Sequence, residues 1–398
     1  MSGYKLVYFP IRGRGERTRL AFAAAKIDFE DTRLPFEEWA KEKASGRPPF
    51  GHLPYIVTPE GKLLGQSGSV TKYICKKGGL CPADSFDEAT ADSIGDEAMD
   101  LVEAVIKLHF EKDEKKKEES TKKFFETTLP DELKNFEAIL KSRDGGKAFF
   151  LGDKARRTVQ TSLVTLSLVG DCVFGRSQES SETSTEMSGY KHVYFPIRGR
   201  GERTRLAFVA TKVEFEDVRV PFEDWQKEKA SGRPPFDELP YIVTPEGKIL
   251  GQSGAICKYI CKKGGLCPSD PFDEALADSL SDCALDLRER LIKIYYEEDA
   301  ARKEKMQKEF FETTLPARLK KYEGFLESRD GGKAYLFGEK LNYADISIFD
   351  FLNNILLGGK TDVPKELDKF PLLAGHYTRV LNVPEIKAWI EKRPQTTG

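Results

Sequence analysis

Apolar and polar residues alternate in two short segments near the start of the chain, residues 4–9 and 29–33. Alternation with a period of two is typical of β-strands. Between these segments, residues 13–26 have the spacing of an amphipathic helix, with Leu20, Ala21 and Ala24 on one face. The pattern therefore predicts that the chain opens with a strand, a helix and a second strand.

A hairpin and another helix are predicted next. The apolar segments 53–57 and 62–64 flank Pro59-Glu60-Gly61, and such a turn sequence between two short apolar runs is typical of a hairpin. Residues 66–76 then read as a helix. Together with the first three elements, they predict a small α/β sandwich.

The pattern changes after Pro82, which closes this first part. Residues 88–119 and 120–142 have helical periodicity and contain few strand-forming residues, so we read them as two helices. The outline is thus a small α/β domain followed by an all-α domain.

The whole pattern then occurs a second time. The sequence of residues 1–16 returns at residues 187–202 with one substitution, which gives a period of 186 residues. A unit of this length is a whole globular protein and far exceeds a solenoid repeat. The chain is therefore a tandem of two related proteins, here called the first copy and the second copy.

Charge and hydropathy exclude several kinds of partner. The net charge is -2, so we expect no binding to nucleic acid or to an anionic membrane. No run approaches 18 apolar residues, and no apolar signal segment stands at the beginning, so we expect a cytoplasmic protein with no membrane span.

The seven cysteines form an odd set, which favours reduced thiols. The spacing of Cys257, Cys261 and Cys267 is compatible with a metal site. However, Thr71 takes the first of these positions in the first copy, and no histidine lies nearby in the sequence. We therefore predict no metal.

Several motifs recur in both copies in the same order and at the same spacing. In the first copy they are Tyr8-Phe9, Arg14-Gly15-Glu16, Trp39 with Lys43, Pro49-Phe50, Leu53-Pro54 and Gln66-Ser67, and the chain closes with the motif of residues 389–396. Together they resemble the cytosolic glutathione transferases, most closely the sigma class, which includes haematopoietic prostaglandin D synthases and S-crystallins. The resemblance covers about residues 1–152 and 187–398.

The resemblance implies a fold: an α/β thioredoxin-like domain followed by an all-α helical domain, present twice in tandem, with the helical domain truncated in the first copy. The expected boundaries are 1–82 and 83–170 for the two domains of the first copy, 171–186 for a polar linker, and 187–268 and 269–398 for the two domains of the second copy. The first copy lacks counterparts of roughly residues 351–394.

The chemistry centres on a thiol. A thiol such as that of glutathione has a pKa near 8.5, and the thiolate is the nucleophile, so an enzyme must stabilise the anion. A phenol can donate a hydrogen bond to sulfur. Tyr8 and Tyr194 stand at the end of a predicted strand, with Arg14 and Arg200 six residues on as cations. The alternative is that these tyrosines only fill an edge strand; the resemblance implies that they are catalytic.

The resemblance also implies where the rest of glutathione would bind. The γ-glutamyl carboxylate would lie at the helix start formed by Gln66 and Ser67, where backbone N–H groups attract an anion; simple N-capping by Ser67 is the alternative. The expected glutathione-binding residues in both copies are Trp39, Lys43, Leu53, Pro54, Gln66, Ser67, Asp96, Trp225, Lys229, Leu239, Pro240, Gln252, Ser253 and Asp282.

Three groups in that set have roles that the resemblance specifies further. Leu53-Pro54 and Leu239-Pro240 are expected to have cis peptide bonds. Trp39 and Lys43 would share a helical face at the glycyl carboxylate, where the alternative is a surface ion pair. Asp96 and Asp282 would reach across a dimer interface to the γ-glutamyl amine.

The two copies differ at the loop before the expected cis-proline. The first copy has Gly51-His52, whereas the second has Asp237-Glu238. Two acids near a carboxylate of the ligand would repel it. This feature alone predicts weaker glutathione binding in the second copy.

The copies also differ at the start of the family's central helix. Asn342 and Asp345 have the spacing of a capping box. In the first copy, Thr158 would cap and Thr161 would replace the acidic partner.

Two arrangements of the copies are expected as alternatives. The first copy would dock on the second as an intramolecular pseudo-dimer, or the chain would form a homodimer through the second copy.

We therefore expect a glutathione transferase that conjugates glutathione, as co-substrate, to small electrophiles, with a possible prostaglandin isomerase or peroxidase side activity. The alternative is a structural or passive ligand-binding protein similar to the S-crystallins. The enzyme is favoured because both copies contain the same set of residues, which in the first copy is Tyr8, Arg14, Trp39 and Lys43.

Overall fold

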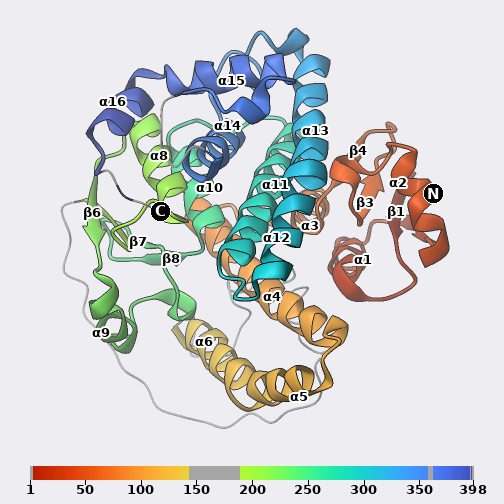
Figure 1. Cartoon of the computed structure of the whole chain (residues 1–398), viewed down its shortest axis with the longest axis horizontal. Helices are drawn as coiled ribbons and strands as arrows, with labels where there is room; N and C mark the ends of the chain where they lie inside the picture. The colour runs from red at the N-terminus through yellow and green to blue at the C-terminus, as the bar shows by residue number, and fades with distance from the viewer. Residues whose placement is uncertain (1–2, 143–188, 357–361, 395, 397–398) are drawn as a thin grey trace.

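The computed structural model of the chain describes residues 3–142, 189–356, 362–394 and 396 (Figure 1). Each copy contains a four-stranded sheet. The strands of the first copy are β1 (Tyr4–Tyr8), β2 (Phe29–Arg33), β3 (Tyr55–Val57) and β4 (Leu63–Gly65), and those of the second are β5 (Tyr190–Tyr194), β6 (Phe215–Arg219), β7 (Tyr241–Val243) and β8 (Ile249–Gly251). The strand orders are β2-β1-β3-β4 and β6-β5-β7-β8. In both sheets the first pair is parallel and the others are antiparallel.

Helices complete each α/β domain. They are α1 (Gly13–Ala25), α2 (Trp39–Ala44) and α3 (Ser67–Lys77) in the first copy, and α8 (Gly201–Thr211), α9 (Trp225–Ala230) and α10 (Ser253–Lys263) in the second, with short 3-10 turns at Phe36–Glu38, Pro49–Gly51, Phe222–Asp224 and Pro235–Asp237. The core of the first domain includes Leu6, Phe22, Ile56 and Ile74, all fully buried. The predicted strand-helix-strand and hairpin order is thus confirmed, and α2 provides the helical face that was expected to carry Trp39 and Lys43.

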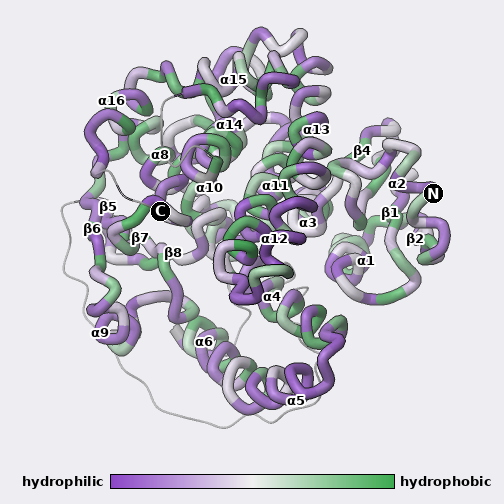
Figure 2. The backbone as a smooth tube through the Cα atoms, in the orientation of Figure 1, coloured by the Kyte–Doolittle hydropathy of each residue, from purple (hydrophilic) through white to green (hydrophobic). Residues whose placement is uncertain are grey.

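The helical part of the first copy consists of α4 (Ser85–Phe110), α5 (Glu114–Lys123), a π-helical turn (Phe124–Thr128) and α6 (Leu129–Ser142). The predicted helix limits, 88–119 and 120–142, were wrong. The break falls at residues 111–113, because the Asp113 carboxylate accepts hydrogen bonds from the N–H groups of Lys115 and Lys116 and so begins α5 there. Helix α5 is almost entirely hydrophilic (Figure 2) and has no buried residue.

The second copy has a longer helical part within the described residues. Its helices are α11 (Pro271–Tyr295), α12 (Ala300–Glu309), α13 (Leu315–Ser328), α14 (Tyr343–Asp350), α15 (Pro371–Leu381) and α16 (Pro384–Lys392), with π-helical turns at Phe310–Thr314 and Phe351–Leu356 and 3-10 turns at Asp330–Gly332 and Lys365–Leu367. The expected domain boundary at residue 82 falls between the end of α3 and the start of α4. The boundary at residue 268 falls between the end of α10 and the start of α11.

The predicted capping box at the start of α14 is confirmed. The Asn342 side chain accepts a hydrogen bond from the Ala344 N–H, and the Asp345 carboxylate accepts one from the Asn342 N–H. Asp345 is fully buried and also contacts His376 Nε2 at 2.7 Å, a partner that the sequence did not indicate. The corresponding prediction for Thr158 and Thr161 lies outside the described residues.

The two copies pack against each other within the chain. Figure 1 shows α3 of the first copy beside α11 of the second, and α4 beside α10. Lys76 Nζ lies 2.6 Å from the Glu274 carboxylate, and Lys262 forms the equivalent ion pair with Glu88. The Phe50 ring packs on Tyr322, with 6.2 Å between centroids. These contacts bring the start of α3 and the start of α10 to the same interface.

Among the described residues, no helix has the length and apolar character needed to cross a membrane.

Candidate active site

Tyr8 ends β1 with its phenol against the start of α1. The Arg14 backbone N–H donates a hydrogen bond to Tyr8 Oη at 3.1 Å, and the Arg200 N–H donates to Tyr194 Oη at 3.0 Å. Gly13 allows this approach: it has a φ of +39°, and a Cβ there would lie 2.7 Å from Tyr8 Oη. The geometry is thus the same in both copies.

Both phenols are in their protonated form at neutral pH. Each tyrosine is 6% exposed, and burial raises the pKa of Tyr8 and of Tyr194 above the usual value, although the hydrogen bond from the arginine N–H acts in the opposite direction. Since the N–H donates to the phenol oxygen, the phenol O–H is available as a donor. A sulfur anion placed beside it would be stabilised.

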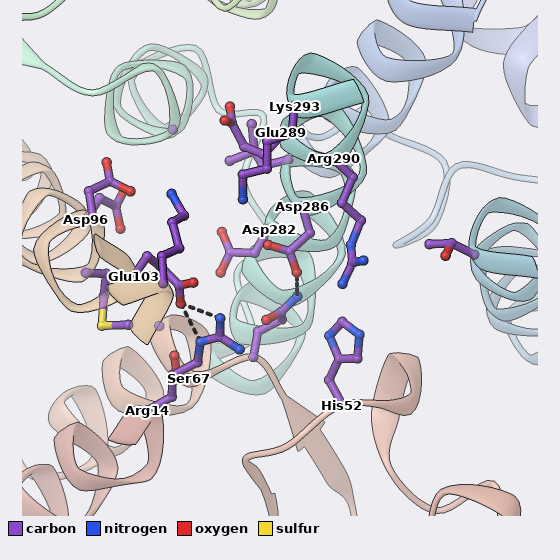
Figure 3. Close-up of a pocket in the computed structure, with 18 of the residues that line it drawn as sticks. Arg14, His52, Ser67, Asp96, Glu103, Asp282, Asp286, Glu289, Arg290 and Lys293 are labelled. Carbon is purple, nitrogen blue, oxygen red and sulfur yellow. Dashed lines mark hydrogen bonds and ion pairs between the residues drawn. The ribbon is translucent and has the colours of Figure 1, made fainter. Parts of the chain in front are cut away.

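The guanidinium groups of Arg14 and Arg200 are ion-paired in the structure. Arg14 Nε donates to Glu103 Oε1 at 2.6 Å (Figure 3), and Arg200 Nη2 lies 2.9 Å from Glu289 Oε1. These glutamates were not predicted from the sequence. They occur at the same separation from the arginine in both copies, so a comparison of the copies could have found them.

The start of α3 lies at the interface between the copies. Gln66 has a left-handed φ of 64° and makes no side-chain capping bond, and Ser67 is the first helical residue, so simple capping by Ser67 does not occur. Gln252 has a φ of 62° before α10. A strained non-glycine residue at the same place in both copies is typical of a functional site.

Asp282 and Asp96 reach across the interface in a reciprocal manner. Ser69 Oγ donates to Asp282 Oδ2 at 3.0 Å. A Cβ on Gly68 would lie 3.5 Å from Asp282 Oδ2, and a Cβ on Gly254 would lie 3.5 Å from Asp96 Oδ2. Each aspartate thus lies at the helix start of the other copy, and Figure 3 shows Asp282 and Ser67 around one space.

The peptide bonds Leu53-Pro54 and Leu239-Pro240 are cis, which confirms the expectation. Leu53 and Tyr8 belong to one buried cluster, and Leu239 and Tyr194 belong to the equivalent one. The cis-proline loop therefore packs beside the phenol in each copy.

Trp39 and Lys43 lie on α2, where Lys43 Nζ is 6.0 Å from the centroid of the Trp39 ring. The equivalent Lys229 is different, because its Nζ lies 3.6 Å from the carboxylate of Asp237. Asp237 takes the place of Gly51. The positive charge of this lysine is thus partly neutralised in the second copy.

One cavity of about 600 Å³ lies between the copies. The predicted site residues that line it are Arg14, Leu53, Pro54, Gln66, Ser67, Asp96, Arg200, Gln252, Ser253 and Asp282. The other predicted residues, Tyr8, Trp39, Lys43, Tyr194, Trp225, Lys229, Leu239 and Pro240, are outside its lining. The structure thus brings the helix-start and interface residues of both copies into one space. The two phenols accept hydrogen bonds from the N–H groups of Arg14 and Arg200, whose side chains line that space.

Within the described residues, the carboxylates of Glu97, Asp100 and Glu238 are the ones whose spacing would suit a metal ion, since their oxygens lie within 4.8 Å of one another. Cys257 and Cys261 are buried free thiols, and Cys267 is a partly buried free thiol. None of the three belongs to this group.

Comparison with known proteins gives the family. The glutathione S-transferase N-terminal domain matches residues 4–76 and 191–262, and the C-terminal domain matches residues 99–155 and 285–393. Hematopoietic prostaglandin D synthase of Gallus gallus is 34% identical over 53% of this chain and 99% of its own length, and glutathione S-transferase 1 of Ascaris suum is 35% identical over 53% and 99%. The structure of prostaglandin synthase D of Nilaparvata lugens has 32% identity and a TM-score of 0.46, covering 52% of this chain and 98% of that chain.

The fold and site define a thioredoxin-like domain joined to a helical domain, present twice. The chain belongs to the glutathione S-transferase family, and the expected class of enzyme, a glutathione transferase of sigma-like type in tandem, is confirmed. Because nearly the whole length of each relative corresponds to about half of this chain, the tandem arrangement is confirmed too.

Proposed function

We propose that the chain conjugates the glutathione thiolate to small electrophiles, with Tyr8 and Tyr194 each donating a phenol O–H to the sulfur. The observation that carries this proposal is the hydrogen bond from the Arg14 N–H to Tyr8 Oη, repeated by Arg200 and Tyr194. In this hydrogen bond the phenol oxygen accepts from the backbone, so its O–H remains free to donate. The hydrogen bond also increases the acidity of the O–H that faces the thiolate.

The rest of glutathione would extend from the phenol toward the interface. Its γ-glutamyl carboxylate would accept hydrogen bonds from the first N–H groups of α3, beside Gln66 and Ser67. Its ammonium would pair with Asp282 from the other copy, which already lies at this helix start. Lys43 and Trp39 would hold the glycyl carboxylate. The second copy would use Gln252, Ser253, Asp96, Lys229 and Trp225 in the same roles.

The two sites would be unequal. Lys229 is paired with Asp237, whereas the first copy has Gly51 at that place, so glutathione would bind more weakly in the second copy. The second copy, however, has a described helical part that extends through α16. Such helices would wall the space for the electrophile, so complete catalysis is assigned to the second copy.

A second candidate activity is isomerisation of a prostaglandin endoperoxide. The 34% identity to a protein named hematopoietic prostaglandin D synthase favours it. Reduction of organic hydroperoxides would use the same thiolate. A purely structural or passive ligand-binding role, as in the S-crystallins, is the outcome if neither activity is found.

The experiment is a conjugation assay of the full chain with glutathione and a chromogenic aryl halide. The unsubstituted chain should turn over, and the Tyr8→Phe/Tyr194→Phe double variant should lose about 10²-fold in kcat/KM. Full activity in the double variant would contradict the proposed roles, and a folded chain without any activity would favour the passive role.

A further inference from the structure

The last helix of the chain, α16, packs against α8, which begins directly after Arg200 (Figure 1). The closing motif of residues 389–396 lies at the end of α16, and none of its described residues lines the cavity between the copies. Two of its side chains contact Glu202 of α8 instead. Trp389 Nε1 donates to Glu202 Oε1 at 2.8 Å, and Arg393 Nη1 donates to the same oxygen at 2.7 Å.

The ion pair between Arg393 and Glu202 is shielded from water. The two side chains are 2% and 1% exposed. Arg393 also donates to the side-chain oxygens of Asn353 at 2.9 Å and Asn354 at 3.1 Å, which belong to the turn after α14. Because hydrogen bonds are stronger and their geometry is better fixed in such a dry environment, α16 holds the Glu202 carboxylate in one position.

The second carboxylate oxygen of Glu202 contacts Arg205, which holds the loop between β5 and α8. Arg205 Nη1 lies 3.4 Å from Glu202 Oε2 and donates to the Ile197 carbonyl at 2.9 Å. Its Nη2 donates to the Phe195 carbonyl at 3.4 Å. The contacts that begin on α16 therefore continue to the backbone of this loop.

Tyr194 is sensitive to the position of this loop. The Arg205 guanidinium carbon lies 5.7 Å from the centroid of the Tyr194 ring. The loop leads to Arg200, whose N–H donates to Tyr194 Oη at 3.0 Å. A shift of the loop would thus move the backbone donor that acts on the phenol.

The one substitution between residues 1–16 and 187–202 belongs to the same network. His192 takes the place of Leu6 and is fully buried. Its Nδ1 lies 3.2 Å from Asp217 Oδ1, which also accepts a hydrogen bond from Arg205 Nε at 2.8 Å. Burial lowers the pKa of His192 to about 4, so the ring is neutral and donates to the carboxylate. The second copy therefore holds Arg205 from both ends.

The first copy has the inner part of this network without the contacts from a last helix. Arg19 Nη1 donates to the Ile11 carbonyl and to Glu16 Oε2, both at 3.0 Å. The chain has three tryptophans, of which one begins α2, one begins α9 and the third is Trp389, so the first copy has no counterpart of Trp389. The Glu16 side chain is 23% exposed, against 1% for Glu202. Water thus reaches this carboxylate in the first copy.

We infer that Trp389 and Arg393 are positioning residues for the second site, acting through Glu202 and Arg205 on the loop that leads to Arg200. The inference deepens the proposed function and rests on it, because it says how the second phenol is held for the thiolate. The two sites then differ in the rigidity of this loop, although the loops have the same sequence.

Hydrogen exchange followed by mass spectrometry tests the inference on the full chain without any ligand. Residues 8–16 and 194–202 are identical, so their amides have the same intrinsic exchange rates, and peptides that include Ala23 or Val209 differ in mass. The loop of the second copy should exchange about tenfold more slowly than that of the first, and Arg393→Met should remove most of this difference. Equal rates in the two loops, or a difference that survives in Arg393→Met, would overturn the inference.

A milder variant serves if Arg393→Met does not fold, as judged by circular dichroism, because an unpaired buried carboxylate is costly. Trp389→Phe removes one donor to Glu202 and keeps an aromatic ring against Phe215, from which the Trp389 ring lies 6.1 Å. It should speed exchange of the second loop by about threefold. An unchanged rate in this variant would equally overturn the inference.

Kinetics separate positioning from simple docking of the helix, in a chain with Tyr8→Phe so that only the second site is measured. Trp389→Phe should lower kcat about threefold and raise the pKa in the pH profile of kcat/KM by about 0.5 unit, with KM for glutathione changed less than about twofold. The matched control is Glu385→Gln, since Glu385 joins α16 to Lys212 of α8 at 2.7 Å on the exposed side.

The control variant Glu385→Gln should leave both kcat and the pH profile unchanged. An equal loss of kcat in the control, or a rise in KM alone with Trp389→Phe, would overturn the positioning role. Absence of conjugation in the unsubstituted chain would contradict the proposed function alone, because the exchange measurement does not depend on turnover.

Discussion

The backbone N–H of Arg14 donates a hydrogen bond to Tyr8 Oη at 3.1 Å, so this arginine reaches the phenol through its main chain, while its guanidinium pairs with Glu103. Arg200, Tyr194 and Glu289 repeat the arrangement. The side chain and the backbone of one residue therefore have separable contributions.

Because Arg200→Ala keeps the backbone N–H that donates to Tyr194, it should lower kcat/KM by no more than about tenfold, against about 10²-fold for Tyr194→Phe. Both variants are made in a chain that carries Tyr8→Phe, so that the second site alone is measured. Glu289→Gln, which breaks the same ion pair, is the matched control. A loss with Arg200→Ala as large as with Tyr194→Phe would show that the guanidinium acts on the sulfur directly.

Asp237 and Gly51 offer an exchange between the copies. Asp237→Gly should free Lys229 and raise the glutathione affinity of the second site by about twofold, since an exposed ion pair is worth about 0.5 kcal/mol. Gly51→Asp should weaken the first site similarly; its backbone φ of +66° is close to the +54° of Asp237, so the fold should tolerate it. Isothermal titration calorimetry measures both, and weaker binding in Asp237→Gly would be the contrary result.

Asp282 gives a pH dependence. Burial raises the pKa of this carboxyl to about 7, against the opposing charge of Lys72. Since the glutathione ammonium needs the ionised carboxylate, affinity at this site should rise roughly tenfold from pH 6 to pH 8. Asp282→Asn should flatten that rise in a titration by fluorescence quenching. A profile that keeps its slope in Asp282→Asn would assign the titration to another group.

The same group affects stability with a definite sign. A carboxyl whose pKa is raised in the folded state favours folding below its unfolded pKa, near 4, and that contribution is lost as the pH rises through about 7. The free energy of unfolding should therefore fall less between pH 4 and pH 7 in Asp282→Asn than in the unsubstituted chain.

The capping box of α14 predicts that substitutions of Asp345 and Asn342 lower the free energy of unfolding by different amounts. Asp345 is fully buried and accepts hydrogen bonds from the N–H groups of Leu336 and Asn342 as well as contacting His376, so Asp345→Ala should cost about 3 kcal/mol of unfolding free energy. Asn342→Ala should cost about 1 kcal/mol. Urea denaturation measures both, and equal losses would mean that the wider network around Asp345 contributes little.

Much of the fold was predictable because it is local. The strands at 4–9 and 29–33 and the hairpin around Pro59 follow from short-range periodicity and turn residues. Helix α2 could be expected only from the four-residue spacing of Trp39 and Lys43, because six residues carry too little apolar periodicity. The break before Asp113 was missed because the charged run that follows it has no apolar period to interrupt.

The site was predictable only in part, for a physical reason. Tyr8, Gln66 and Leu53 lie in one continuous domain, and their motifs could be read from the sequence. Glu103 comes from α4, and Arg393 follows α16, so their contacts depend on how separate domains pack.

Stabilisation of the glutathione thiolate by Tyr8 and Tyr194 is tested most directly by a pH titration of bound glutathione. The ultraviolet absorbance of the thiolate is followed in the unsubstituted chain and in Tyr8→Phe/Tyr194→Phe. The bound thiol should have a pKa about 2 units below the free value near 8.5, and in the double variant its pKa should return to within about 0.5 unit of that value. An unshifted pKa in the unsubstituted chain, or a shift that survives in the double variant, would contradict it.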